Sequence, residues 1–311
     1  MCMANTPLAE VIARGLSGVP KSLPPRVLYD ERGSRLFEQI TTLPEYYPTE
    51  AERALLSSSA AQIADATGMR TLVELGAGVL DKSRILIDAG LAGGTLDYYI
   101  PVDISVEVLE QSARELQLRY PSLSIGAREA DFMEELAIGA LESPVVLSLL
   151  GGTIGNLFPM ERIDFLRRMG HAAGPGNYLL IGTDLVKDVD RIIDAYFDSQ
   201  GITEAFLLNV VQVINDECGS KLSAEDFDYV PLWDAREARM DLRLRARRDL
   251  DIDFPGSRSR CRIAAQEEIR IEVSSKFTLE QVRSELQTAG STVLDQYSDG
   301  DFALTLAVVD S

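Results

Sequence analysis

The chain has 311 residues, 46% of them hydrophobic and 25% charged, which is ordinary for a globular protein with a sizeable core. Its net charge of −19 repels the polyphosphate backbone of nucleic acids, so we expect no nucleic-acid partner. No secretory leader, run of about 18 apolar residues or C-x-x-C pair is recognisable, so we expect a cytoplasmic protein without a membrane partner.

The chain contains one histidine, His171, and this excludes a metal site built from several histidines. His171 stands where we expect a helix to end, which favours a surface or capping role over a place in a Ser-His or Cys-His nucleophilic device. We therefore expect no metal in the site.

Helix and strand signals alternate from residue 49 to residue 186. The segment 49–67 has helical spacing, with Thr49 as candidate N-cap and Glu52 as its capping-box partner. Strands are expected at 71–76, 96–105, 123–132, 144–156 and 177–186, with helices at 81–92, 106–121 and 159–173. This alternation predicts a parallel sheet with helices on both faces.

The pattern resumes near the C-terminus with a helix at 278–290 and two strands, 291–298 and 301–309, joined by a hairpin signal. An antiparallel hairpin on the edge of the parallel sheet gives a Rossmann-like α/β fold with seven strands. Residues 187–276 then look inserted, with helices at 190–201 and 205–219 and strands within 236–254 and 260–275.

The first 50 residues lack sheet signals and are rich in turns, so we expect them to join the insertion. The predicted division is a sheet domain of residues 51–186 and 277–311, and a second, smaller α+β domain of residues 1–50 and 187–276.

The stretch "TLVELGAGVLDKS" at 71–83 is a buried strand that runs into a glycine turn. Gly76 and Gly78 allow a ligand to approach the backbone closely. Asp81 stands where a dinucleotide fingerprint requires its third glycine, which argues against a pyrophosphate at the helix N-terminus.

Acidic residues end the next two predicted strands, at the edge of the sheet where ligands bind. Asp103 can accept hydrogen bonds from ribose hydroxyls, and Asp131 from an adenine amino group, with Phe132 against the ring. S-adenosylmethionine has a ribose and an adenine but no phosphate, so the arrangement favours it over a nicotinamide cofactor and indicates a methyltransferase.

Five stretches of the sequence resemble the histidine Nα-methyltransferases of ergothioneine biosynthesis, the dimethylhistidine N-methyltransferase family. They are "LYDERGSRLFEQITTLPEYYPTEAE" at 28–52, "ELGAG" followed by Lys82, "PVDIS", "GGTIGN" and "IEVSSKF". The resemblance, which covers nearly the whole chain, implies S-adenosylmethionine as cofactor, L-histidine as a small-molecule substrate, and the betaine hercynine as product. We also expect a monomer.

Carried over residue by residue, the resemblance implies two sets of contacts. Those to the cofactor are Tyr29, Gly76, Lys82, Asp103, Asp131 and Phe132, with Tyr29 also near the substrate. Those to the substrate are Tyr46 and Asn156 at the α-amine, Gly151 and Thr153 in the same pocket, Tyr196 and Ser274 at the carboxylate, and Glu272 at the imidazole. Leu242 replaces a methionine common in the family and is expected to be an apolar wall of the substrate-binding domain.

The chemistry needs a neutral amine in line with the sulfonium methyl, and Tyr46 and Asn156 are the catalytic candidates. Tyr46 is a candidate base, with water as the alternative acceptor of the proton. Taken alone, Tyr46 could be a packing residue, Asn156 a helix cap and Glu272 a solvent-facing strand residue. Methylation of another amino acid, aromatic ones first, and a non-catalytic ligand-binding module on the same fold are the alternative functions.

Overall fold

The computed structural model describes residues 8–311 except 79–81, 104–105, 134–135, 137 and 255–259. The chain divides into two compact units. Unit 1 contains the described residues up to Tyr47 together with Lys187–Ser275, and unit 2 contains Pro48–Val186 and Lys276–Ser311. Among the described residues, no helix has the length and apolarity required to span a membrane.

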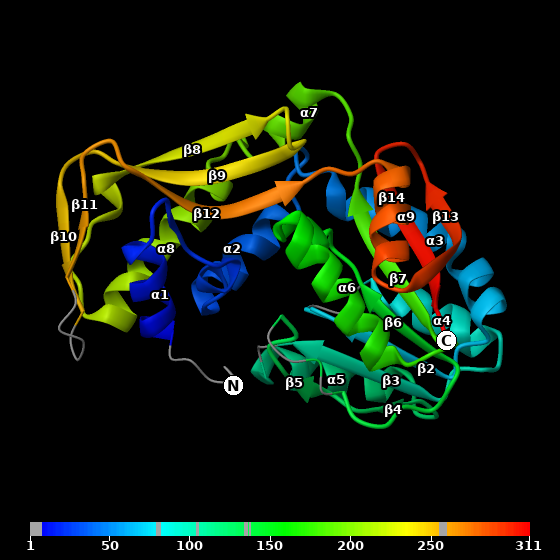
Figure 1. Cartoon of the computed structure of the whole chain (residues 1–311). Helices are drawn as coiled ribbons and strands as arrows, with labels where there is room; N and C mark the ends of the chain where they lie inside the picture. The colour runs from blue at the N-terminus through cyan, green and yellow to red at the C-terminus, as the bar shows by residue number, and fades with distance from the viewer. Residues whose placement is uncertain (1–7, 79–81, 104–105, 134–135, 137, 255–259) are drawn as a thin grey trace. The chain divides into compact units, whose positions relative to one another are not determined.

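Unit 2 is built on one sheet with the strand order β13-β14-β7-β6-β2-β3-β4, and β5 also pairs with β3 (Figure 1). The strands are β2 (Thr71–Leu75), β3 (Tyr98–Asp103), β4 (Ser124–Ile125), β5 (Arg128–Glu129), β6 (Val145–Leu149), β7 (Tyr178–Asp184), β13 (Ser291–Ser298) and β14 (Phe302–Val309). Every pairing from β7 to β5 is parallel, and β14 is antiparallel to both β7 and β13. The Rossmann-like, mostly parallel sheet is confirmed. In the described part of the chain it has eight strands rather than the predicted seven, because the predicted strand 123–132 is split into β4 and β5.

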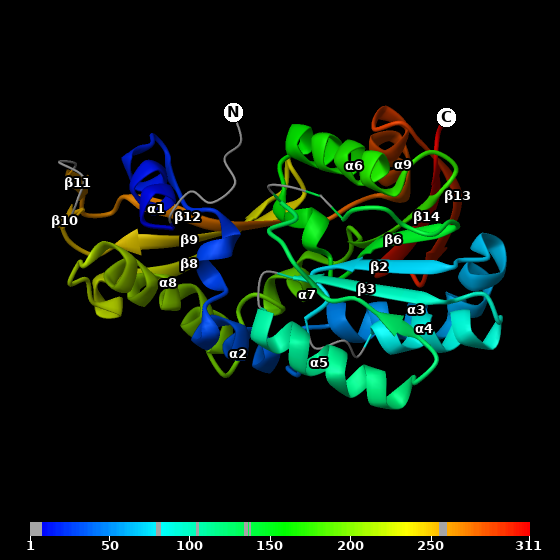
Figure 2. The same cartoon turned by 90° about the horizontal axis from the view of Figure 1, so that it is seen from below.

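Helices cover both faces of this sheet (Figure 2). They are α3 (Pro48–Thr67), α4 (Ser83–Ala92), α5 (Val106–Arg119), α6 (Pro159–Ala173) and α9 (Leu279–Thr288). Neighbouring residues of a strand point to opposite faces, so Leu72 packs in the cluster with α3 and α4, and Val73 in the cluster with α6 and α9.

Unit 1 combines a four-stranded sheet, a two-stranded hairpin and a set of helices. The sheet has the order β1 (Lys21–Ser22), β12 (Glu268–Ser275), β9 (Arg239–Ala246) and β8 (Phe227–Asp234), and the hairpin consists of β10 (Leu250–Asp253) and β11 (Arg260–Ile263). The helices are α1 (Leu8–Ser17), α2 (Glu31–Ile40), α7 (Val189–Asp194) and α8 (Ile202–Cys218), with 3-10 turns η1 (Pro25–Leu28) and η3 (Ala224–Asp226).

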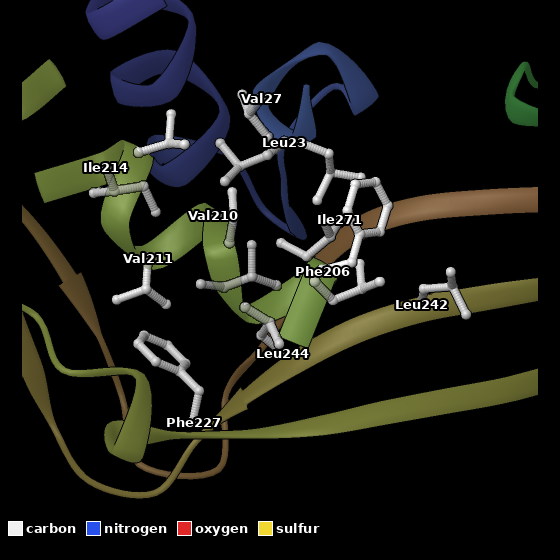
Figure 3. Packing of buried hydrophobic residues seen from close by; sticks show 14 of the residues in the cluster. Leu23, Val27, Phe206, Val210, Val211, Ile214, Phe227, Leu242, Leu244 and Ile271 are labelled. Atoms are coloured by element: carbon white, nitrogen blue, oxygen red, sulfur yellow. The ribbon is translucent and has the colours of Figure 1, made fainter. Parts of the chain in front are cut away.

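One hydrophobic core holds unit 1 together. Phe206 and Val210 of α8 pack with Leu242 and Leu244 of β9 and Ile271 of β12 (Figure 3). Helices therefore cover one face of the sheet, and the smaller unit has the predicted α+β composition.

The N-terminal segment differs from the prediction, because it forms α1, α2 and β1 rather than turns alone. Gly33 weakens the helical signal of α2, but a Cβ at this position would lie 1.7 Å from the Leu28 carbonyl oxygen. Glycine is therefore required by a close approach of two backbone segments. The strand β8 was also not predicted, because Pro231 interrupts the strand pattern of its sequence. Proline is tolerated there because β8 is an edge strand of the sheet.

The predicted capping box at Thr49 and Glu52 is wrong. The helix α3 begins at Pro48, so Thr49 lies inside the helix. Proline suits the first helical position because its φ is preset and its missing N–H would have no helical partner there. Glu52 is fully buried and is bonded to residues far along the chain instead. His171 is exposed in the last turn of α6.

Candidate active site

The glycine turn follows the buried strand β2. Gly76 and Gly78 have φ angles of +68° and +50°, in the region that glycine adopts without strain. Among the described residues, a Cβ at Gly78 would meet nothing within 4 Å, whereas one at Gly76 would lie 3.4 Å from Cζ of Phe132. The turn thus offers open space beside its backbone and an aromatic ring next to it. Asp81 lies outside the described residues.

One acidic side chain, that of Asp103, lies beside this turn, and a second, that of Asp131, follows β5. Asp103 ends β3, and its Oδ2 accepts a hydrogen bond from the Gly78 N–H at 3.1 Å. Asp131 lies two residues beyond β5, and its Oδ1 accepts from the Met133 N–H at 3.1 Å. The predicted cofactor residues Gly76, Asp103 and Phe132 are therefore gathered at the carboxyl ends of β2 and β3.

The buried acid of β2, Glu74, is a site feature that the sequence reasoning missed. It accepts hydrogen bonds from the hydroxyl groups of Ser83, at the start of α4, and of Tyr99, in β3, the latter at 2.8 Å. Burial raises the pKa of Glu74, and these two hydrogen bonds oppose the rise. Its role is to fix the strand before the glycine turn to the helix after it.

The loop after β6 carries the other predicted residues of unit 2. Gly151 and Gly152 have φ angles of +76° and +69°, and the 3-10 turn η2 (Thr153–Asn156) follows them. Thr153 Oγ1 donates to the Leu150 carbonyl oxygen at 3.2 Å. Lys82, which precedes α4, also reaches this loop: a Cβ on Gly151 would lie 3.5 Å from its Nζ.

In unit 1, a bulge in β12 decides which way Glu272 points. Arg270 pairs with Arg243, but Glu272 pairs with Leu242 and Ser274 with Met240, because the register shifts between Arg270 and Glu272. Residues directly opposite in a ladder share a face of the sheet. Glu272 and Ser274 therefore share the face of Leu242 and Met240, which belong to the helix-covered core.

Hydroxyl groups gather around these two residues. The Tyr196 hydroxyl donates to Ser274 Oγ at 2.6 Å, and the Tyr229 hydroxyl donates to the Tyr196 carbonyl oxygen at 2.7 Å. Burial, and then the nearby charge of Glu272, raise the pKa of Tyr229 well above its usual value. Tyr229 belongs to β8, so it was missed together with that strand.

Aromatic rings connect Tyr46 and Tyr29 within unit 1. Tyr46 lies edge-on to Tyr196 at 6.4 Å and to Phe37 at 6.3 Å between ring centroids, and Phe37 lies 5.7 Å from Tyr29. Such edge-to-face pairs stabilise each other's ring orientation. Leu242 is only 1% exposed, so it backs Glu272 from within the core, and its role as an apolar wall stays a prediction.

The predicted site residues thus form two groups, one in each unit. Unit 1 holds Tyr29, Tyr46, Tyr196, Leu242, Glu272 and Ser274, and unit 2 holds Gly76, Lys82, Asp103, Asp131, Phe132, Gly151, Thr153 and Asn156. The two catalytic candidates, Tyr46 and Asn156, belong to different units, so their joint action on one amine stays a prediction.

The sheet order, the glycine turn and the acid at the end of β3 define an S-adenosylmethionine-dependent methyltransferase. Residues 8–310 match the family described as histidine-specific, S-adenosylmethionine-dependent methyltransferases, and the chain belongs to this family.

Relatives of similar length support this assignment. The chain is 41% identical to a histidine N-alpha-methyltransferase of Mycolicibacterium smegmatis, over 98% of this chain and 97% of that protein. It is also 41% identical to the histidine N-alpha-methyltransferase of Mycobacterium tuberculosis, over 96% of this chain and 94% of that protein. The ergothioneine biosynthesis protein 1 of Neurospora crassa is 30% identical over 91% of this chain, which matches 32% of that longer protein.

Proposed function

We propose that this protein transfers methyl groups from S-adenosylmethionine to the α-amine of L-histidine and produces hercynine, the trimethylated betaine of ergothioneine biosynthesis. The observation that carries the proposal is the bulge in β12, which directs Glu272 and Ser274 to the core face of the sheet, where the Tyr196 hydroxyl donates to Ser274. A carboxylate can accept an imidazole N–H, and the two hydroxyl groups can donate to a carboxylate. The names of the relatives point to the same substrate.

The residues of the glycine turn fit S-adenosylmethionine. Among the described residues, nothing fills the space beside the Gly78 backbone. Asp103 lies next to this turn, where it can accept hydrogen bonds from ribose hydroxyls, and the Phe132 ring lies against Gly76. Lys82 and Asp131 complete the proposed cofactor contacts in unit 2, and Tyr29 those in unit 1. When bound, S-adenosylmethionine supplies an activated methyl group on a sulfonium.

The chain's own part in the reaction is to orient the amine and to manage its proton. The amine must be neutral, with its lone pair directed at the methyl carbon from about 3–3.5 Å. We assign the orientation to Tyr46 and Asn156, which can accept hydrogen bonds from the amine, with Gly151 and Thr153 beside them. Tyr46 is also the proposed acceptor of the proton, and water is the alternative.

Binding of the substrate's other groups is assigned to unit 1. Tyr196 and Ser274 hold the α-carboxylate and Glu272 holds the imidazole. Sites that hydrogen-bond a polar group of the substrate reject analogues that lack it far better than apolar pockets do. This supports histidine over phenylalanine or tryptophan as the substrate.

The experiment is transfer of label from methyl-labelled S-adenosylmethionine to each of the standard amino acids in turn. The proposal predicts label in histidine above all others. Strongest label in an aromatic amino acid would favour that substrate instead, and no label in any amino acid would favour a ligand-binding module. Cytoplasmic location and a monomeric state stay predictions, and light scattering of the purified protein tests the second.

A further inference from the structure

Glu52 of α3 is a buried acid that none of the assignments above uses. Its side chain is fully buried, and its carboxylate has an ionic partner and a hydrogen-bond donor. The carboxylate forms an ion pair with Lys82 Nζ, and its two oxygens accept the Gly151 N–H at 2.8 and 2.9 Å. A buried carboxylate is stable only with such partners, because desolvation strongly disfavours an uncompensated charge.

The carboxylate has one defined place in unit 2. Gly182 of β7 faces it so closely that a Cβ there would lie 2.2 Å from Glu52 Oε1. The absence of a side chain at Gly182 thus makes room for the acid. Glu52 is held between β7, Lys82 and the loop after β6.

The two partners of Glu52 come from the two halves of the proposed site in unit 2. Lys82 follows the glycine turn, among the cofactor residues. Gly151 begins the segment 151–156, which carries Thr153 and Asn156 for the substrate amine. Movement of either partner away from Glu52 would leave part of its buried carboxylate without a donor.

We propose that Glu52 is a positioning residue that fixes Lys82 and the segment 151–156 in one arrangement, so that binding of the cofactor and binding of the substrate depend on each other through it. The substrate half of this proposal rests on the proposed substrate; the cofactor half rests only on the proposed contact of Lys82 with the cofactor.

The first test is Glu52→Gln, which keeps the size of the side chain and removes the charge that holds Lys82. By calorimetry, its affinity for S-adenosylhomocysteine should fall at least about tenfold, equivalent to about 1.4 kcal/mol. The matched control is Glu285→Gln, in the buried pair of Glu285 with Arg162 at 2.7 Å between α6 and α9. The control should bind S-adenosylhomocysteine as the wild type does.

A second readout separates positioning from a general loss of stability. In the wild type, saturating S-adenosylhomocysteine should change the affinity for histidine by at least about threefold, and in Glu52→Gln this factor should approach one. The control should keep the wild-type factor. Absence of coupling in the wild type, or its survival in Glu52→Gln, would overturn the proposal.

A double-mutant cycle with Lys82→Met tests whether Glu52 affects cofactor binding through Lys82. Because Glu52 acts on the cofactor through Lys82, the double variant should bind S-adenosylhomocysteine no more weakly than Lys82→Met alone. Losses that simply add would show that Glu52 acts elsewhere.

If Glu52→Gln does not fold, Gly182→Ala takes its place, because the added methyl group displaces the carboxylate without changing its charge. It should reproduce the weakened binding of S-adenosylhomocysteine, and unchanged binding would overturn the proposal. A wild type that binds S-adenosylhomocysteine in a Glu52-dependent way but does not methylate histidine would refute the proposed function and leave the cofactor half intact.

Discussion

Glu272 and Glu268 lie on the same strand, β12, but have opposite surroundings. Glu268 accepts hydrogen bonds from Arg243 and Arg245 on the charged face of the sheet. Glu272, beyond the bulge, shares the core face with Leu242 and lies near Tyr229. Both are glutamates, so the pair allows the proposed substrate-binding carboxylate to be compared with a structural one.

Replacement of Glu272 by alanine should lower kcat/KM for histidine at least about tenfold, because the imidazole loses its acceptor. The preference for histidine over tryptophan should also narrow, since the buried carboxylate then no longer opposes the entry of an apolar ring. Competition between equal concentrations of the two amino acids measures this. Glu268→Gln is the control and should keep the wild-type preference; if Glu272→Ala keeps it too, Glu272 does not contact the ring.

Replacement of Tyr46 by phenylalanine removes one hydroxyl group and keeps the ring that packs on Phe37 and Tyr196. If the hydroxyl accepts the proton of the amine, turnover should fall by about 10²–10⁴ while the affinity for S-adenosylhomocysteine stays near that of the wild type. Steady-state kinetics and calorimetry check the two parts.

The neighbouring hydroxyl provides the control for Tyr46→Phe. Tyr47 is bonded to Lys187 at 2.9 Å, and Tyr47→Phe removes a hydroxyl group that has no assigned role in the reaction. Its turnover should stay near that of the wild type. A loss under about threefold in Tyr46→Phe would mean that water takes the proton and that Tyr46 only packs.

Some residues were predictable because their signal is local. Gly76, Gly78 and Asp103 follow strands whose apolar runs are plain in the sequence, and the structure brings them together. Glu52 was misassigned because its partners, Lys82 and Gly151, are 30 and 99 residues away. Within its own helix it satisfies a capping pattern, and only tertiary contacts reveal its place.

At the scale of elements, the sheet of unit 1 separates an apolar face from a charged one. Asp241 of β9 is bonded to Arg243 and Arg270 at 2.6 and 2.8 Å on the charged face. Burial opposes its ionisation, but these hydrogen bonds outweigh burial and lower the pKa of Asp241 to about 2 from 3.8. The charged form therefore ties β9 to β12.

This shift predicts a pH dependence of stability. Because the folded pKa of Asp241 is below the unfolded one, its contribution is complete above pH 3.8 and is lost as pH falls toward 2. The difference corresponds to about 2 kcal/mol at neutral pH. Urea unfolding of the wild type and Asp241→Asn should show a gap in the free energy of unfolding that shrinks between pH 4 and pH 2. A gap that stays constant over this range would contradict the assignment.

The elements of unit 2 were easier to predict than those of unit 1. Strands buried on both faces give continuous apolar runs, as in β2, β6 and β7, whereas β8 carries two aspartates and a proline. The bulge in β12 has no signal in the sequence, although the alternation around Glu272 correctly placed it on the side of Ser274. Only the pairing of β12 with β9 shows that Glu272 and Ser274 lie on the core face of the sheet rather than on the charged face.

At the scale of the whole molecule, each unit has a hydrophobic core of its own, although each is assembled from two separate segments. The chain passes from one unit to the other near residues 186 and 276, and contacts within unit 2 hold both of these segments. The Val186 N–H donates to the Phe277 carbonyl oxygen at 2.9 Å, and Lys276 pairs with Asp184 at 2.7 Å.

A shortened chain tests whether the units are independent domains, as we propose. It lacks residues 1–47 and replaces 187–275 by a short glycine-rich linker between Val186 and Lys276. The hydrophobic clusters on the two faces of the unit 2 sheet remain in this chain. It should therefore unfold cooperatively and keep measurable affinity for S-adenosylhomocysteine, but it should not methylate histidine. Asp103→Asn in the shortened chain is the control and should weaken that binding; a shortened chain without a cooperative transition would contradict independence.

The central claim is that the whole protein converts histidine to hercynine, and mass spectrometry of the reaction tests it most directly. The wild type is incubated with S-adenosylmethionine and equal amounts of histidine and tryptophan. We predict a product that is histidine with three added methyl groups on the α-nitrogen, while tryptophan stays unmodified. Methylation of tryptophan in preference to histidine, or no mass gain in either, would contradict the account.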